Sequence, residues 1–223
     1  MTLFDFFYKF TIFVELIIPF IPIFWGLKNW NKMSIALKLI LVFIIVDWLI
    51  YWSSFYLYDL AQNNLFLHYF HSFFSNLLIL LSFHNLFKSR IEKKTVTILI
   101  ILNTIIIVLD YIYFKENKDF NFLSGGWIDL TIFIVSTYYF TVNFISVEKK
   151  NNHFHTDNLL ISLTLSLQFL IKLIDVFMRF FLSDTQNHSL ISIQEGVLYS
   201  YFMFFSILLY SYIFYKVKPY EQV

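Results

Sequence analysis

In Gln168-Phe-Leu-Ile-Lys172-Leu-Ile-Asp175-Val-Phe-Met-Arg179, four polar residues interrupt a long apolar run. Their spacing of i, i+4, i+7 and i+11 places them on one face of an α-helix. Charged side chains such as Lys172 and Asp175 cost several kcal/mol when they face hydrocarbon, so this face is expected to meet other helices or water. The segment therefore predicts a helix with a polar stripe inside a membrane bundle.

The composition of the whole chain agrees with a membrane protein. Of 223 residues, 59% are hydrophobic and 14% are charged, whereas a soluble domain of this length needs a more polar surface. Cysteine is absent, which excludes disulfides and thiolate metal sites, and no segment is basic enough to bind nucleic acid. We expect an all-α polytopic protein in which residues 1–223 form a single membrane domain, with no cofactor and no metal site.

Seven segments are each long enough to cross a bilayer, which requires roughly 20 helical residues. Short polar breaks separate them, so consecutive helices should be antiparallel neighbours. The expected spans are residues 4–25, 35–57, 65–87, 95–114, 127–147, 159–182 and 193–215.

The distribution of Lys and Arg predicts the orientation, because cytoplasmic loops carry an excess of these residues. If the N-terminus lies outside, ten of them fall in the inside segments and two in the outside loops. The ten are Lys28, Lys32, Lys88, Arg90, Lys93, Lys94, Lys149, Lys150, Lys216 and Lys218, and the two are Lys115 and Lys118. This bias favours seven spans, an outer N-terminus and a cytoplasmic C-terminus, in a bacterial plasma membrane.

Ionisable residues within the spans gather at the middle or in the outer half, where we expect a ligand-binding pocket. The candidate binding residues are Glu15, Asp47, Tyr51, His68, His71, Asp110, Lys172, Asp175 and Arg179, with Asp129, Glu195 and Gln168 as weaker candidates. Six of them are carboxylates and only Lys172 and Arg179 are fixed cations, so an apolar site would need protons, charged histidines, water or a cation for balance. This imbalance predicts an acidic pocket that binds a small cationic or zwitterionic molecule, or responds to protons.

Several of these residues also have ordinary structural explanations. Asp129 and Glu195 lie in the first turns of expected helices, where the helix dipole favours a carboxylate. Arg179 could extend to the outer headgroups, and His68 and His71 lie near an expected interface, where a structural role is an alternative. Their H-x-x-H spacing is a weak metal signal on its own. A buried salt bridge between Lys172 and Asp175 is a further alternative, although such pairs seldom add net stability.

The segments Asn64-Leu-Phe-Leu-His-Tyr69 and Asn121-Phe-Leu-Ser124, with a short tail after the last span, resemble uncharacterised small bacterial seven-helix integral membrane proteins. That resemblance implies the fold and supplies no activity. The expected topology is also similar to that of rhodopsin-like proteins. However, span 193–215 contains neither a Lys for a retinal Schiff base nor a His for a ceramidase-like zinc site.

Four classes of function stay open from the sequence. A sensor or receptor would couple the outer pocket to the basic inner loops Lys88–Lys94 and Glu148–His155, which could contact a cytosolic or membrane signalling partner. A transporter or channel for protons or a small cation would need a continuous polar path, and the inner halves look too apolar for one. A scaffold subunit would direct its polar stripes at a partner. An enzyme is the weakest alternative, because no catalytic triad, phosphate loop or metal motif is present.

Overall fold

The computed structural model describes residues 12–14, 16–59, 65–114, 121–147, 153–182 and 188–217, and within these ranges it is helical, without strands. This confirms the expected all-α class. The elements are α2 (Phe20–Lys28), the 3₁₀ turn η1 (Trp30–Lys32), α3 (Ile35–Asp59), α4 (Leu65–Leu86), α5 (Arg90–Phe114), α6 (Asn121–Val147), α7 (His153–Leu182) and α8 (His188–Lys216).

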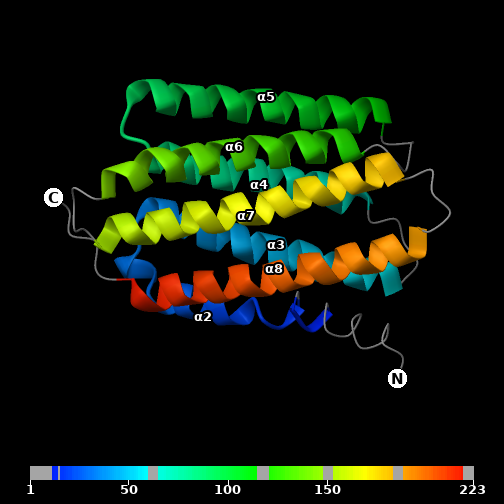
Figure 1. Ribbon diagram of the computed structural model, residues 1–223, viewed down its shortest axis with the longest axis horizontal. Helices are drawn as coiled ribbons and strands as arrows, with labels where there is room; N and C mark the ends of the chain where they lie inside the picture. Colours follow the sequence, from blue (N-terminus) through cyan, green and yellow to red (C-terminus); the bar gives the residue numbers. More distant parts are fainter. Residues whose placement is uncertain are drawn as a thin grey trace.

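The helices form an elongated bundle in which they lie roughly side by side and successive helices reverse direction (Figure 1). Helix α4 is central in this arrangement, because it packs against α3, α5 and α6. Helix α5 lies at one edge and contacts mainly α4 and α6, while α2 packs against α8 and α3 near the opposite edge.

Four helices are long and apolar enough to cross a membrane, as judged from length and composition over the described residues. These segments are Ile35–Leu57, Arg90–Tyr113, Ser124–Ile145 and Thr156–Ile174. On α5 and α6, large apolar side chains such as Ile101, Ile105 and Ile134 point outward, as expected for contact with lipid. These features are compatible with an integral membrane protein, and the seven-span count and the orientation stay predictions.

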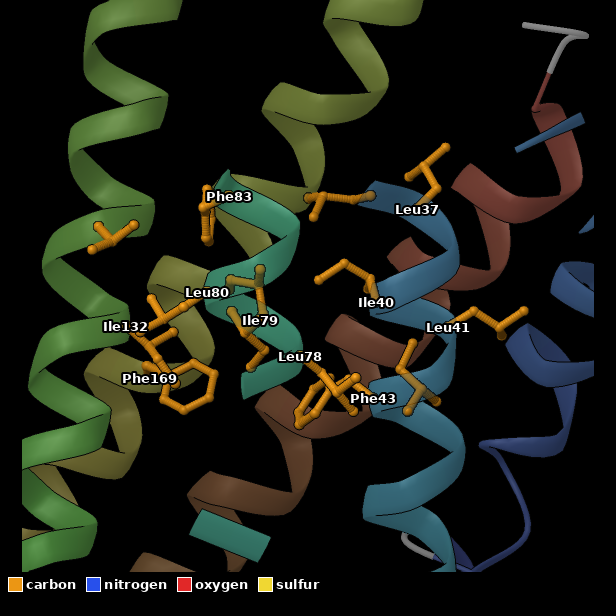
Figure 2. Close-up of a cluster of buried hydrophobic side chains, with 14 of the residues drawn as sticks. Leu37, Ile40, Leu41, Phe43, Leu78, Ile79, Leu80, Phe83, Ile132 and Phe169 are labelled. Atoms are coloured by element: carbon orange, nitrogen blue, oxygen red, sulfur yellow. The ribbon is translucent and has the colours of Figure 1, made fainter. Parts of the chain in front are cut away.

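The apolar core runs between α3, α4, α6, α7 and α8 (Figure 2). Among its largest fully buried side chains are Ile40 of α3, Phe83 of α4 and Phe169 of α7. Between membrane helices such side chains contribute mainly through close dispersion contacts, since lipid is as apolar as the core. The core therefore depends on the fit between neighbouring helices.

Small polar residues join α6 to α7. Ser166 Oγ lies 3.0 Å from Ser136 Oγ and accepts a hydrogen bond from the Thr137 hydroxyl at 3.3 Å. Ser136 and Ser166 also donate to carbonyls of their own helices, so these groups are satisfied inside the bundle. This is the packing and hydrogen-bonding role that small polar residues commonly have between membrane helices.

One end of the bundle carries a group of basic residues, and we call it the basic end. Its members are Lys28, Lys32, Lys88, Arg90 and Lys216, which lie where α2, α4 and α8 end and where α3 and α5 begin (the left side of Figure 1).

Several contacts fix the helices to one another at the basic end. Asn29 is buried and donates from Nδ2 to the carbonyl oxygen of Phe214 on α8 at 2.9 Å. The Lys28 ammonium lies 4.9 Å from the centre of the Trp25 ring. A hydrogen bond to the Tyr212 hydroxyl raises the pKa of the exposed Lys216 ammonium.

Candidate functional site

Asp47 of α3 and His71 of α4 form an ion pair inside the bundle when the imidazole is protonated. Asp47 Oδ1 lies 2.7 Å from His71 Nε2, and each side chain is 27% exposed. Ser75, one turn further along α4, places its Oγ 3.5 Å from the same imidazole nitrogen. Asp47 is twelve residues beyond Ile35, which puts it about 18 Å from the start of α3. The pair therefore lies deep in the bundle but remains partly accessible.

Helices α7 and α8 add three further polar residues at this level. The Lys172 ammonium interacts electrostatically with the Asp47 carboxylate and lies 4.9 Å from the centre of the Phe169 ring. Gln168, one turn before Lys172, is buried and accepts a hydrogen bond from the Tyr210 hydroxyl at 3.3 Å. Tyr210 in turn interacts with the charge of Asp47. We call this group the central polar cluster; it comprises Asp47, His71, Gln168, Lys172 and Tyr210.

The charges of the central polar cluster nearly balance. Asp47 supplies one negative charge, Lys172 one positive charge, and His71 a second positive charge only when it is protonated. A buried carboxylate with two potential cationic partners can remain ionised, because each partner offsets part of its desolvation cost. Within the described side chains, the cluster therefore combines an anionic and a cationic group. The expected acidic surplus stays a prediction, because the side chains of Glu15, Asp175 and Glu195 lie outside the described part of the chain.

The other candidate residues from the sequence lie elsewhere or outside the described side chains. Tyr51, one turn beyond Asp47 on α3, is exposed. Asp129 is half-buried on α6. Asp110 is buried on α5, where it interacts with Tyr69 of α4. The remaining candidates have side chains outside the described part of the chain; they are Glu15, His68, Asp175, Arg179 and Glu195.

Sequence reasoning missed Tyr210 as a member of the cluster. A polar stripe along span 193–215 includes Ser206, and Tyr210 follows one helical turn later on the same face. The periodicity thus contained a signal, but one tyrosine among 15 in the chain does not stand out.

A second polar network links α4, α5 and α6. The Trp127 indole donates to Asn103 Oδ1 at 3.0 Å, and Asn103 Nδ2 donates to Asn76 Oδ1 at 2.8 Å. Asn76 Nδ2 completes the chain by donating to the carbonyl oxygen of Ile100 at 3.3 Å. Asn76 and Asn103 are fully buried and form these bonds with each other and their neighbours, so the network fixes how the three helices pack.

An apolar layer lies between the central polar cluster and the basic end. On α3 it contains Ile40 and Leu41, on α4 Ile79 and Phe83, and on α8 Phe214, all of them fully buried. Figure 2 shows Ile40 of α3 pointing toward α4, while Leu41 points the other way, toward α2. Among the described side chains, this layer separates the cluster from the basic end.

The geometry gives the central polar cluster a restricted chemistry. Its carboxylate can accept from an amine, its ammonium can donate to a carboxylate or another oxygen acceptor, and its imidazole can exchange a proton. Among the described side chains, no three His, Asp or Glu residues form a metal-binding group. Comparisons with protein-family models, with curated proteins and with solved structures find no match.

Proposed function

We propose that this chain is a seven-span protein of a bacterial plasma membrane that senses a small zwitterionic or cationic molecule with its central polar cluster. The observation that carries the proposal is the Asp47–His71 pair deep in an apolar bundle, together with the Lys172 ammonium of another helix, which acts electrostatically on the Asp47 carboxylate. Such groups are costly in a membrane, and they most often mark a ligand or ion site.

The cluster has the two charges that a zwitterion requires. A ligand amine would bind the Asp47 carboxylate, and a ligand carboxylate would bind the Lys172 ammonium. Charge-assisted hydrogen bonds of this kind are about twice as strong as neutral ones. The 27% exposure of Asp47 and His71 supports access to the pair for a small molecule.

The proposed orientation rests on the basic end. Basic residues concentrate on the cytoplasmic side of membrane proteins, so the basic end would face the cytoplasm. The cluster lies beyond the apolar layer from that end and would open toward the outside. The exposed cations Lys88, Arg90 and Lys94 would then be available to a cytosolic or membrane signalling partner.

The Asp47–His71 pair suggests how binding would alter the bundle. A ligand amine that takes Asp47 as its partner would replace or weaken the contact to His71, which joins α3 to α4. The ligand would thereby stabilise a different arrangement of these helices, in proportion to its differential affinity for the two states. Because α4 ends at Leu86, just before the turn that carries Lys88 and leads to Arg90 of α5, the change would reach the basic end along a rigid helix.

The apolar layer favours a sensor over a transporter. A transporter would have to open a polar path between Ile40, Ile79, Phe83 and Phe214, all of which are fully buried. A sensor needs only the site and two helix arrangements.

The test is a thermal-shift screen of the purified protein in detergent against amino acids, small amines and nucleosides. We expect saturable stabilisation by one zwitterionic or cationic class, since a ligand that binds only the folded state raises the melting temperature. A hit is then tested for flux across liposomes that contain the protein. Stabilisation without flux supports the sensor, flux replaces it by a transporter, and no stabilisation by any compound would leave the scaffold subunit as the better account.

A further inference from the structure

The first apolar segment is interrupted by a turn. Helical residues up to Leu16 are followed by a turn at residues 17–19, and α2 begins at Phe20. Because proline has no N–H to donate to the preceding turn, Pro19 and Pro22 break the helical ladder at this point. The segment therefore has an upstream section, which ends at Leu16, and a second section, α2, which leads to the basic end.

The backbone hydrogen bonds change at the turn. In a regular helix the Leu16 carbonyl would accept from the Phe20 N–H, four residues later. The Phe20 N–H donates instead to the Ile17 carbonyl at 3.2 Å, only three residues back. The Leu16 carbonyl accepts a hydrogen bond from a side chain of α3, because Trp48 Nε1 donates to it at 2.8 Å. This bond satisfies a carbonyl that water does not reach inside a membrane bundle.

Trp48 contacts the segment on both sides of the turn. Its Nε1 binds Leu16 before the turn, and its ring packs edge-on against Phe20 after the turn, with ring centres 4.6 Å apart. The upstream section is also anchored on α8, where Val14 belongs to an apolar cluster with Ile207. One side chain of α3 thus holds the upstream section and α2 together across the break.

Trp48 belongs to the face of α3 that packs against α2. Leu41 precedes it by seven residues and so lies on the same face. A Cβ atom on Gly26, near the end of α2, would lie 2.6 Å from the methyl carbons of Leu41, so the two helices are in close contact there. Helix α3 therefore holds α2 at two points, at Leu41 near the basic end and at Trp48 beside the turn.

Asp47 occupies the adjacent face of α3, because consecutive residues are about 100° apart around a helix. It follows Ile40 by seven residues, and Ile40 points toward α4 (Figure 2). Asp47 accordingly contacts His71 of α4 at 2.7 Å, while Trp48 contacts the first segment. Two consecutive residues of α3 thus connect the α3–α4 contact to the break in the first segment.

We propose that the turn at residues 17–19 is a hinge and that Trp48 is the latch that closes it. A rotation of α3 that alters the Asp47–His71 contact withdraws the indole from the Leu16 carbonyl and frees α2 to move relative to the upstream section. Because α2 ends at Lys28, the hinge gives the central polar cluster a second connection to the basic end, besides α4. That a ligand causes the rotation rests on the proposed function, whereas the hinge and its latch do not.

The experiment measures the distance between two spin labels on the purified full-length protein in detergent, without a ligand. The labels are attached through Asn31→Cys, in the turn η1 that follows α2, and Asn85→Cys, near the end of α4. Both positions are exposed, and the chain has no cysteine of its own. Because no ligand is present, the result does not depend on the thermal-shift screen that tests the proposed function.

Four variants are compared in this labelled background. Trp48→Phe removes the indole donor and keeps an aromatic ring beside Phe20, and Asp47→Asn weakens the contact to His71. Trp52→Phe makes the same substitution at an exposed position one turn later on α3, and it is the control. Pro19→Ala restores a backbone donor at the turn and so favours a continuous helix.

We expect Trp48→Phe and Asp47→Asn both to broaden the distance distribution, and Trp52→Phe to leave it as in the wild type. Hydrogen exchange in peptides that cover residues 16–23 should rise about two- to tenfold in Trp48→Phe, as expected for the loss of one hydrogen bond. Pro19→Ala should narrow the distribution, which provides a test even if Trp48→Phe does not fold. The proposal is overturned if Trp48→Phe, Asp47→Asn or Pro19→Ala folds and keeps the wild-type distribution.

Discussion

Asp47 Oδ1 and His71 Nε2 lie 2.7 Å apart, although the two residues belong to different helices and each side chain is about one-quarter exposed, at 27%. The contact joins α3 and α4 at the depth where the apolar layer gives way to polar side chains. In the proposed function, a ligand amine would compete for the same carboxylate, so this contact would be the part of the bundle most directly sensitive to binding.

A double-mutant cycle measures the strength of this contact. We expect Asp47→Asn and His71→Gln each to lower the free energy of unfolding, and the double variant to lose less than the sum. The coupling energy should be about 0.5–1.5 kcal/mol, since partly exposed polar pairs in membrane proteins are of this size. As a control, Ser53→Ala on α3 removes an exposed hydroxyl that bonds only to the Leu49 carbonyl, and it should change little. Strict additivity in the cycle would show that the two side chains do not interact.

Gly26 of α2 is required by its close approach to Leu41 of α3. A Cβ atom at position 26 would lie 2.6 Å from both terminal methyl carbons of Leu41, a fully buried side chain. We expect Gly26→Ala to destabilise the protein by about 1–3 kcal/mol through overpacking. Gly125 of α6 has no atom within 4 Å of its would-be Cβ, so Gly125→Ala should be neutral or slightly stabilising. Thermal unfolding compares the two variants, and equal effects would contradict the close approach of α2 and α3.

Asn103 connects Trp127 to Asn76, so its removal leaves two partners unsatisfied. We expect Asn103→Ala to cost about 1–3 kcal/mol of unfolding free energy, in line with the cost of orphaned polar groups. Thr104→Val on the same helix is the control, because the Thr104 hydroxyl bonds only to a carbonyl of its own helix. The network would have no structural role if the two variants melted at the same temperature.

The proposed orientation can be tested by cysteine labelling, because the chain has no cysteine of its own. Asn31 is exposed at the basic end, and Asn63 lies in the sequence between the second and third expected spans. On intact cells, an impermeant maleimide should label the Asn63→Cys variant and not the Asn31→Cys variant; permeabilised cells should label both. The reverse pattern on intact cells would refute the outer N-terminus.

Much of the helical architecture could be predicted because apolar runs and polar breaks determine where helices can lie in a membrane. The helices extend beyond the apolar runs where capping allows. Helix α5 begins at Arg90 instead of residue 95, because Ser89 and Glu92 supply a capping box: the Ser89 N–H donates to Glu92 Oε2 and the Ile91 N–H to Ser89 Oγ, both at 3.3 Å. Hydropathy alone does not detect such polar first turns.

The cluster could be predicted only in part. Asp47 and Lys172 are conspicuous in the sequence because no helix end or interface explains their charge, whereas the position of His71 near an expected interface also allowed a structural role. Which residues come into contact depends on how each helix is rotated about its axis, and a sequence does not give that rotation. Asp47 and Asp110 were expected in one pocket, but they lie on α3 and α5, against different faces of α4. Tyr69 and His71 show why: two residues that are close in sequence face different neighbours, α5 and α3.

The most direct test of the ligand-binding role is the affinity of wild type and Lys172→Met for two ligands, a hit amino acid and the matching amine without a carboxylate. Lys38→Met, which removes a cation stacked on Trp30, is the control for loss of a lysine. Isothermal titration should show that Lys172→Met raises the Kd of the amino acid about tenfold or more, as expected for one lost charge-assisted bond, and leaves the Kd of the amine nearly unchanged. The account is contradicted if Lys172→Met binds the amino acid as tightly as the wild type, or if it raises the Kd of both ligands equally. In either case Lys172 does not recognise the ligand carboxylate, and the central polar cluster is not the proposed binding site.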